Sequence, residues 1–85
     1  MPEAAPRRVV LYSAGHECPL CDRAKAALES VARETGVAWS LVEVDGDPAL
    51  EARYAKRVPV LSIDGRDAFE GRFDAAAIRR ALAAR

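Results

Sequence analysis

Both cysteines of this 85-residue chain lie in the run Cys18-Pro19-Leu20-Cys21, three positions apart. A β-like apolar run over residues 9–12 precedes this motif, and a helix-like stretch over residues 22–34 follows it. Proline suits the first position of a helix, because its φ is already helical and its missing N–H would have no partner there. The two thiols would then lie about one turn apart on one side of the helix, close enough to form a disulfide. The motif therefore predicts a site that cycles between dithiol and disulfide.

The two cysteines have different predicted roles. Cys18 would lie at the positive end of the helix dipole, where exposed N–H groups favour a thiolate, so we predict that it is the nucleophile. Cys21 lies deeper in the helix, where burial should keep it protonated, and we predict that it is the resolving thiol. A positively charged His16 would favour the thiolate, although a solvated loop residue explains it as well. The neighbouring carboxylate of Glu17 would weakly oppose thiolate formation.

Metal binding is the main alternative use of a C-x-x-C motif. Zinc needs two further ligands, usually another cysteine pair or two histidines, and His16 is the only histidine of the chain. We therefore predict no metal site and favour redox chemistry over a structural role for the pair.

Composition narrows the partners and the location. The 13 Lys and Arg residues balance the 13 Asp and Glu residues, and no basic stripe accompanies aromatic side chains. This pattern argues against nucleic acid or an anionic membrane as the partner. Residues 1–8 lack the apolar region of a signal peptide, and no segment approaches the length of a membrane span. We expect the protein to be a monomer. We also expect a cytoplasmic location, because structural disulfides are rare in that reducing compartment and a C-x-x-C pair there is typical of redox catalysis.

The chain is long enough for one small domain, which we expect over residues 9–85 after a flexible segment at residues 1–8. Its first half reads as a β-α-β unit. The strand at 9–12 should be buried on both faces. The helix over 22–34 carries one apolar stripe and stops at Gly36, and a second strand follows over 39–44. Such a crossover pairs its two strands in parallel.

The second half continues with a short helix opened by Asp47-Pro48 and ending near Arg57, then a strand over 60–63. Asp64-Gly65 predicts a type I′ hairpin, which pairs residues 66–69 antiparallel with that strand. Asp74 can cap the last helix, with Phe73 packed on Ile78 as a hydrophobic staple. The periodicity of these elements assigns seven large side chains to the core or its edge: Tyr12, Leu28, Trp39, Tyr54, Leu61, Ile63 and Phe69.

The predicted order is β-α-β-α-β-β-α, an α/β domain with a four-stranded mixed sheet. A C-x-x-C motif after the first strand of such a domain predicts a thioredoxin-like fold.

Nearly the whole chain, residues 9–82, also resembles the short bacterial glutaredoxin-like family. The segments that carry this resemblance are Leu11-Tyr12 leading into the cysteine motif, Glu43-Val44-Asp45, Arg57-Val58-Pro59 and Phe69-Glu70-Gly71-Arg72. The resemblance implies a thiol-disulfide oxidoreductase that acts on protein or small-molecule disulfides without a separate cofactor. Glutathione or a thioredoxin-reductase-like flavoenzyme would supply its electrons.

The resemblance also implies substrate-binding residues. In thioredoxin-fold proteins the proline that opens the third strand is cis and faces the cysteines, so we expect a cis bond at Pro59 and a substrate contact at the backbone of Val58. Arg57 stands where many glutaredoxins have threonine. It would hold a substrate carboxylate, although a solvated arginine at a helix end explains it equally well. Gly71 matches the second glycine of a pair that lets glutathione approach closely.

Two departures from the family pattern count against tight glutathione binding. Glu70 replaces the first glycine of the pair, and Phe73 stands where a small polar residue usually meets the ligand. Two other functions stay open at this point, a metal or iron–sulfur carrier in which two chains share a cluster through Cys18, and a non-catalytic adaptor that only docks a partner.

Overall fold

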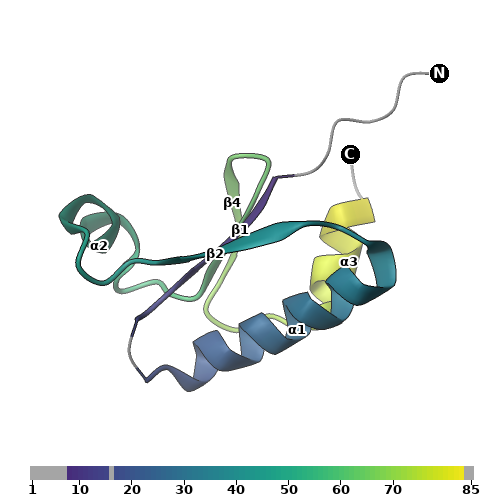
Figure 1. Cartoon of the computed structure of the whole chain (residues 1–85), viewed down its shortest axis with the longest axis horizontal. Helices are drawn as coiled ribbons and strands as arrows, with labels where there is room; N and C mark the ends of the chain where they lie inside the picture. The colour runs from purple at the N-terminus through teal and green to yellow at the C-terminus, as the bar shows by residue number, and fades with distance from the viewer. Residues whose placement is uncertain (1–7, 16, 84–85) are drawn as a thin grey trace.

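The computed structural model describes residues 8–15 and 17–83. Its elements follow the predicted order, β-α-β-α-β-β-α (Figure 1). They are β1 (Val9–Ser13), α1 (Pro19–Thr35), β2 (Trp39–Glu43), α2 (Pro48–Tyr54), β3 (Val60–Ile63), β4 (Arg66–Glu70) and α3 (Ala75–Ala83). Within the described ranges, no helix has both the length and the apolar character needed to cross a bilayer.

The four strands form one mixed sheet in the order β2-β1-β3-β4. β1 pairs in parallel with β2, as the β-α-β crossover predicts, and β3 runs antiparallel to both β1 and β4. The fold class and the mixed sheet are therefore those predicted from the sequence.

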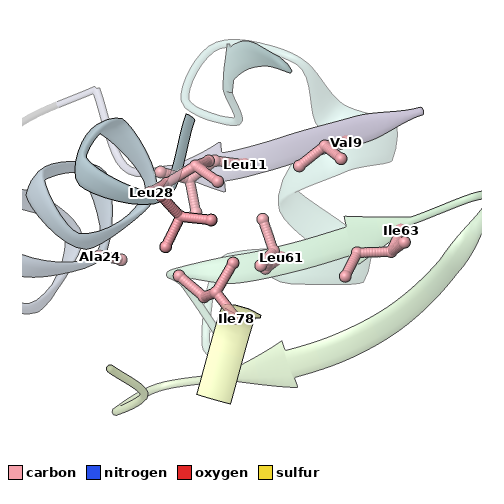
Figure 2. Close-up of a cluster of buried hydrophobic side chains, with 8 residues drawn as sticks. Val9, Leu11, Ala24, Leu28, Leu61, Ile63 and Ile78 are labelled. Carbon is pink, nitrogen blue, oxygen red and sulfur yellow. The ribbon is translucent and has the colours of Figure 1, made fainter. Parts of the chain in front are cut away.

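The main core lies between the sheet and the helices α1 and α3, which cover one of its faces (Figure 1). In Figure 2, Leu11, Leu28, Leu61 and Ile78 point toward one another from β1, α1, β3 and α3. All four are fully buried, and burial of each such side chain contributes roughly 1.5–3 kcal/mol. The whole cluster comprises Val9, Leu11, Ala24, Leu28, Val31, Leu61, Ile63 and Ile78. This packing fixes α1, and with it the cysteine motif, against the sheet.

A second, smaller core places α2 on the other face of the sheet. Side chains alternate along a strand, so Tyr12 faces away from the cluster that holds Leu11. The Tyr12 ring stacks on Tyr54 of α2 with ring centroids 4.2 Å apart, and Val44 and Val60 pack around them. Tyr54 is only 4% exposed. This aromatic contact anchors α2 beside the chain that leads into Pro59.

Local signals set the starts and stops of the elements as expected. Pro19 is the first residue of α1, and Gly36 ends the helix with φ 76° and an N–H donated to the Ala32 carbonyl. Both hairpin residues, Asp64 and Gly65, have positive φ (54° and 84°), which a type I′ turn requires.

The caps of the other two helices also follow the prediction. The carboxylate of Asp47 accepts the N–H groups of Ala49 and Leu50 at the start of α2. Asp74 accepts the N–H of Ala77 at 2.8 Å, and its neighbour Phe73 packs against the cluster that contains Ile78.

Several boundaries and burial predictions were wrong. α2 ends at Tyr54 and not near Arg57, because the Arg57 N–H donates to the Tyr54 carbonyl, three residues back, in place of the Arg53 carbonyl that a continued α-helix would use. β1 is not buried on both faces, since α2 covers only part of the second face and leaves Val10 and Tyr12 half-buried. β2 ends one residue earlier than predicted and β4 one residue later.

The predicted core residues are buried or lie at the core edge, with Tyr12, Trp39 and Phe69 half-buried. Arg8, expected in the flexible segment, is tied to Asp64, because its N–H donates to the Asp64 carboxylate and its carbonyl accepts the Asp64 N–H. Residues 1–7 lie outside the described part of the chain.

We predict that Tyr54 makes the fold sensitive to alkali. Burial raises the pKa of the Tyr54 phenol above its ordinary value of 10.0, and the negative charge of Asp67 acts in the same direction. The unfolded chain therefore loses this proton first, so stability should be complete below about pH 10 and fall as the pH rises toward the pKa of the folded state. Tyr54→Phe should remove the part of the decrease in unfolding free energy at alkaline pH that comes from this phenol.

Urea unfolding of both proteins across this pH range provides the measurement. At neutral pH the substitution should cost about 0.5 kcal/mol, because it removes one long hydrogen bond, 3.3 Å, to Asp67. Equal slopes of unfolding free energy against pH in the two proteins would contradict the assignment to Tyr54.

Candidate active site

The sulfur of Cys18 caps the helix α1. Cys18 is the N-cap residue, with an extended backbone (φ −154°, ψ 93°), and its Sγ accepts the N–H of Cys21 at 3.1 Å. Its carbonyl accepts the N–H of Asp22 at 3.0 Å. The sulfur thus occupies the place that a hydroxyl or carboxylate oxygen takes in ordinary caps, at the positive end of the helix dipole. This position favours negative charge on sulfur.

Cys18 and Cys21 are joined by a disulfide with their Cα atoms 5.2 Å apart, an ordinary separation for such a bond. Their exposure differs, because Cys21 is 3% exposed within the core whereas Cys18 is half-buried at the surface. An incoming sulfur therefore has access to Cys18 first.

Cys18 lies at a cleft of about 380 Å³ that also contains Val58. The bond between Val58 and Pro59 is cis, as expected, and the Pro59 side chain is fully buried. The N–H of Val58 donates to the Tyr54 carbonyl at 3.0 Å, so the Val58 group that remains for an external partner is its carbonyl. The lining of the cleft is Ala14, Glu17, Cys18, Pro19, Leu20, Asp45, Ala55 and Val58.

Gly71 lies at a second cleft, of about 450 Å³, which shares only Leu20 with the first. Arg23 from α1 and Arg72 from the loop before α3 line this cleft, together with Ala27, Gly71, Phe73, Asp74 and Ala75. Gly71 has φ +76°, a conformation that favours glycine, and a Cβ there would meet no atom within 4 Å. The backbone conformation, and not crowding by the protein, requires glycine at this position.

Arg57 lines neither cleft and is already bound by two carboxylates of β4. Its Nε donates to Oε1 of Glu70 at 3.0 Å, and its Nη2 donates to Oδ2 of Asp67 at 3.1 Å. Its Nη1 donates to the Arg53 carbonyl at 3.3 Å. These bonds, first to Glu70 and then to Asp67, raise the pKa of the guanidinium. A substrate carboxylate would have to displace them.

Sequence reasoning missed this network, because the register of the β3–β4 hairpin differs from the predicted one. Arg57 lies three residues before β3, and the hairpin pairs Val60 at the start of β3 with Glu70 at the end of β4. The predicted hairpin, with strands 60–63 and 66–69 around the Asp64-Gly65 turn, pairs Val60 with Phe69 and leaves Glu70 beyond the strand pair.

The loop before Cys18 is held by Asp45, whose Oδ2 accepts the N–H of Gly15 at 3.1 Å. Glu17 is exposed at the rim of the first cleft. His16, a candidate for thiolate stabilisation, lies outside the described residues. In residues 8–15 and 17–83, no three His, Cys, Asp or Glu side chains gather as a set of metal ligands.

Comparison with known proteins agrees with this geometry. Residues 8–83 match the glutaredoxin-like domain (DUF836). The chain belongs to this glutaredoxin-like family. A comparison with curated proteins gave no match.

Solved structures place the glutaredoxin-like domain among thioredoxin folds. An X-ray structure of Northeast Structural Genomics target protein XcR50 from X. campestris is 41% identical, with a TM-score of 0.73 over 87% of this chain and 93% of that chain. The solution structure of Ne2328 from Nitrosomonas europaea is 24% identical, with a TM-score of 0.76 over 95% and 96% of the two chains. Fasciola hepatica thioredoxin is 22% identical, with a TM-score of 0.65 over 91% of this chain and 78% of that chain. The last two show a shared fold.

We predict that the reduced Cys18 thiol has a pKa below that of a free thiol, about 8.5, because the Cys21 N–H and the helix dipole stabilise its thiolate. The ultraviolet absorbance of the thiolate, titrated against pH in a Cys21→Ser background, isolates the Cys18 signal. A midpoint at or above the value of a free thiol would show that the helix terminus does not activate Cys18.

Proposed function

We propose that this glutaredoxin-like domain is a thiol-disulfide oxidoreductase. The observation that carries the proposal is the half-buried residue Cys18, whose sulfur caps α1 at 3.1 Å from the Cys21 N–H and is linked to the buried Cys21. Such a sulfur combines the two properties of a redox nucleophile, a stabilised thiolate and access from solvent.

The reaction has two exchange steps. The Cys18 thiolate attacks one sulfur of a substrate disulfide, so that a bond forms between Cys18 and that sulfur while the other substrate sulfur leaves as a thiolate and takes up a proton. Cys21 then loses its proton and attacks Cys18 Sγ, which releases the second substrate thiol and forms the Cys18–Cys21 disulfide. Two electrons pass from the cysteine pair to the substrate, and no separate cofactor is needed.

The first cleft is the proposed place for the substrate, a protein or small-molecule disulfide. Val58 lies in this cleft with Cys18, so an extended substrate segment can reach the sulfur while the Val58 carbonyl accepts one of its backbone N–H groups. We also propose that the protein is a cytoplasmic monomer. The C-x-x-C pair supports the cytoplasmic location, and the balanced charge argues against nucleic acid or a membrane as its partner.

We predict that the two cysteines fail in different ways when replaced. Cys18→Ser should abolish disulfide reduction, because the attacking sulfur is lost. Cys21→Ser should still form a mixed disulfide through Cys18 and should accumulate it, because the resolving thiol is missing. Mass spectrometry after mixing the reduced variants with a peptide disulfide distinguishes the two.

A Cys21→Ser variant that forms no mixed disulfide would show that the roles are reversed. A wild-type protein that reduces no disulfide would favour the non-catalytic adaptor. Visible absorbance of the freshly purified protein, with no disulfide reduction, would favour the iron–sulfur carrier.

The electron donor is a separate part of the proposal. We expect glutathione to be a slower electron donor than a thioredoxin-reductase-like flavoenzyme. Phe73 stacks on Phe69 with centroids 5.4 Å apart and packs on the main core, so it offers no polar contact in the Gly71 cleft. Glu70, the other departure from the family pattern, is bound by Arg57 and does not line that cleft. The expected obstacle is therefore the missing polar contact, and removal of the Glu70 charge should not help.

The measurement compares turnover of one disulfide substrate with glutathione and with thioredoxin reductase as donor. Turnover with glutathione should be the slower, because an unmade hydrogen bond to a charged ligand lowers its affinity about tenfold. Efficient turnover with glutathione alone would contradict this expectation.

A further inference from the structure

The segment Val58–Pro59 is held between α2 and β4 from both sides. On the α2 side, the Tyr54 carbonyl accepts the N–H groups of Arg57 and Val58, at 2.7 and 3.0 Å. On the β4 side, the N–H of Gly71 donates to the Pro59 carbonyl at 2.8 Å. The backbone that lines the Cys18 cleft is therefore tied to two elements, and the Arg57 side chain is one of the links between those elements.

A β-bulge in β4 aims two carboxylates at Arg57. Val60 pairs with Glu70, and Ser62 pairs with Asp67, so one extra residue lies between these pairs. In a regular strand, positions 67 and 70 would face opposite sides of the sheet, because side chains alternate. The bulge places both carboxylates on the α2 side, where Arg57 reaches them at 3.1 and 3.0 Å.

Tyr54 completes the contact between the elements. Its hydroxyl donates to Oδ1 of Asp67 at 3.3 Å, and the Arg57 guanidinium lies 5.4 Å from the centre of its ring. The planar guanidinium is thus fixed by two carboxylates, the Arg53 carbonyl and an aromatic face. A lysine cannot make the same set of contacts, because its ammonium group lacks the planar array of N–H donors.

We propose that Arg57 is a positioning residue for thiol-disulfide exchange. Its bonds to Asp67 and Glu70 hold the backbone of Val58 at the cleft beside Cys18, in the place where a substrate chain docks. This inference rests on the oxidoreductase function proposed above and replaces the expectation that Arg57 binds a substrate carboxylate. Arg57 is about one-third exposed (34%), and ion pairs of this kind contribute little to global stability, so its effect should lie in geometry.

The test uses substrates that differ in whether they have a backbone. One is a peptide disulfide with blocked termini and no charged side chain, and the other is 2-hydroxyethyl disulfide. Mixed-disulfide formation is timed with reduced protein in the Cys21→Ser background, with and without Arg57→Gln. We expect Arg57→Gln to slow the reaction with the peptide about fivefold, roughly the loss of one ordinary hydrogen bond between the Val58 carbonyl and a substrate N–H. The reaction with the small disulfide and the Cys18 thiolate titration should not change.

Companion variants separate positioning from charge. Glu70→Gln should slow the peptide reaction in the same direction, and Arg57→Gln/Glu70→Gln should be no slower than Arg57→Gln alone, because the Arg57 substitution already removes the bond to Glu70. Arg57→Lys keeps the positive charge but lacks the planar N–H donors of the guanidinium, so its rate with the peptide should lie between those of Arg57→Gln and the parent. The matched control is Arg79→Gln, which breaks a comparable surface pair, Arg79 with Glu34 at 2.7 Å, between α3 and α1. It should leave both reactions unchanged.

Four outcomes would overturn the inference. An unchanged rate for Arg57→Gln with the peptide would remove the positioning role, and equal losses with both disulfides would assign the effect to Cys18 or to the fold. A loss only with a carboxylate-bearing peptide would restore the substrate-binding interpretation. A faster reaction of Glu70→Gln would make Glu70 an electrostatic barrier. If the parent protein reacts with neither disulfide, the proposed function fails as well, which distinguishes that failure from the other four.

Discussion

The hydrogen bond from the Cys21 N–H to Cys18 Sγ is the contact on which the proposed chemistry of this domain depends. It forms because α1 begins at Pro19, one residue after Cys18, so that the sulfur meets the unpaired N–H groups of the first turn. The main core holds that helix in place, since Leu28 and Val31 of α1 are fully buried against the sheet. A small domain thereby gives one sulfur a defined electrostatic environment.

The opposite wall of the Cys18 cleft is built by long-range contacts. Two contacts hold Val58 at this wall. Tyr54 stacks on Tyr12, and the N–H of Gly71, which follows the hairpin, donates to the Pro59 carbonyl. The two walls of the cleft are thus fixed by different cores on opposite faces of the sheet. This division would allow the proposed nucleophile, Cys18, and the proposed docking backbone, Val58, to be positioned independently.

The two clefts that meet at Leu20 differ in charge. Glu17 and Asp45 are the charged residues of the cleft beside Cys18, whereas Arg23, Arg72 and Asp74 line the cleft beside Gly71. A substrate that crosses Leu20 would pass between these two environments, and such differences commonly set specificity and on-rate more than affinity.

The fold and the closeness of Cys18 and Cys21 could be predicted from the sequence, because their signals are local. Pro19 after Cys18, Gly36, Asp64-Gly65 and Asp74 each act within a few residues, through a fixed φ, a positive φ or a cap. The cis bond at Pro59 followed from family resemblance, since an X-Pro sequence alone favours trans.

The contacts of the residues around Val58 could not be predicted from local sequence, because they join distant parts of the chain. Whether Arg57 meets a ligand or a protein carboxylate depends on partners 10 and 13 residues away. That meeting requires the β4 bulge, which turns Asp67 and Glu70 to one side of the sheet, and no local pattern marks where a strand will gain an extra residue. The early end of α2 was not predicted either, because the Arg57 N–H donates to the Tyr54 carbonyl, three residues back, where the chain leaves the helix toward Pro59.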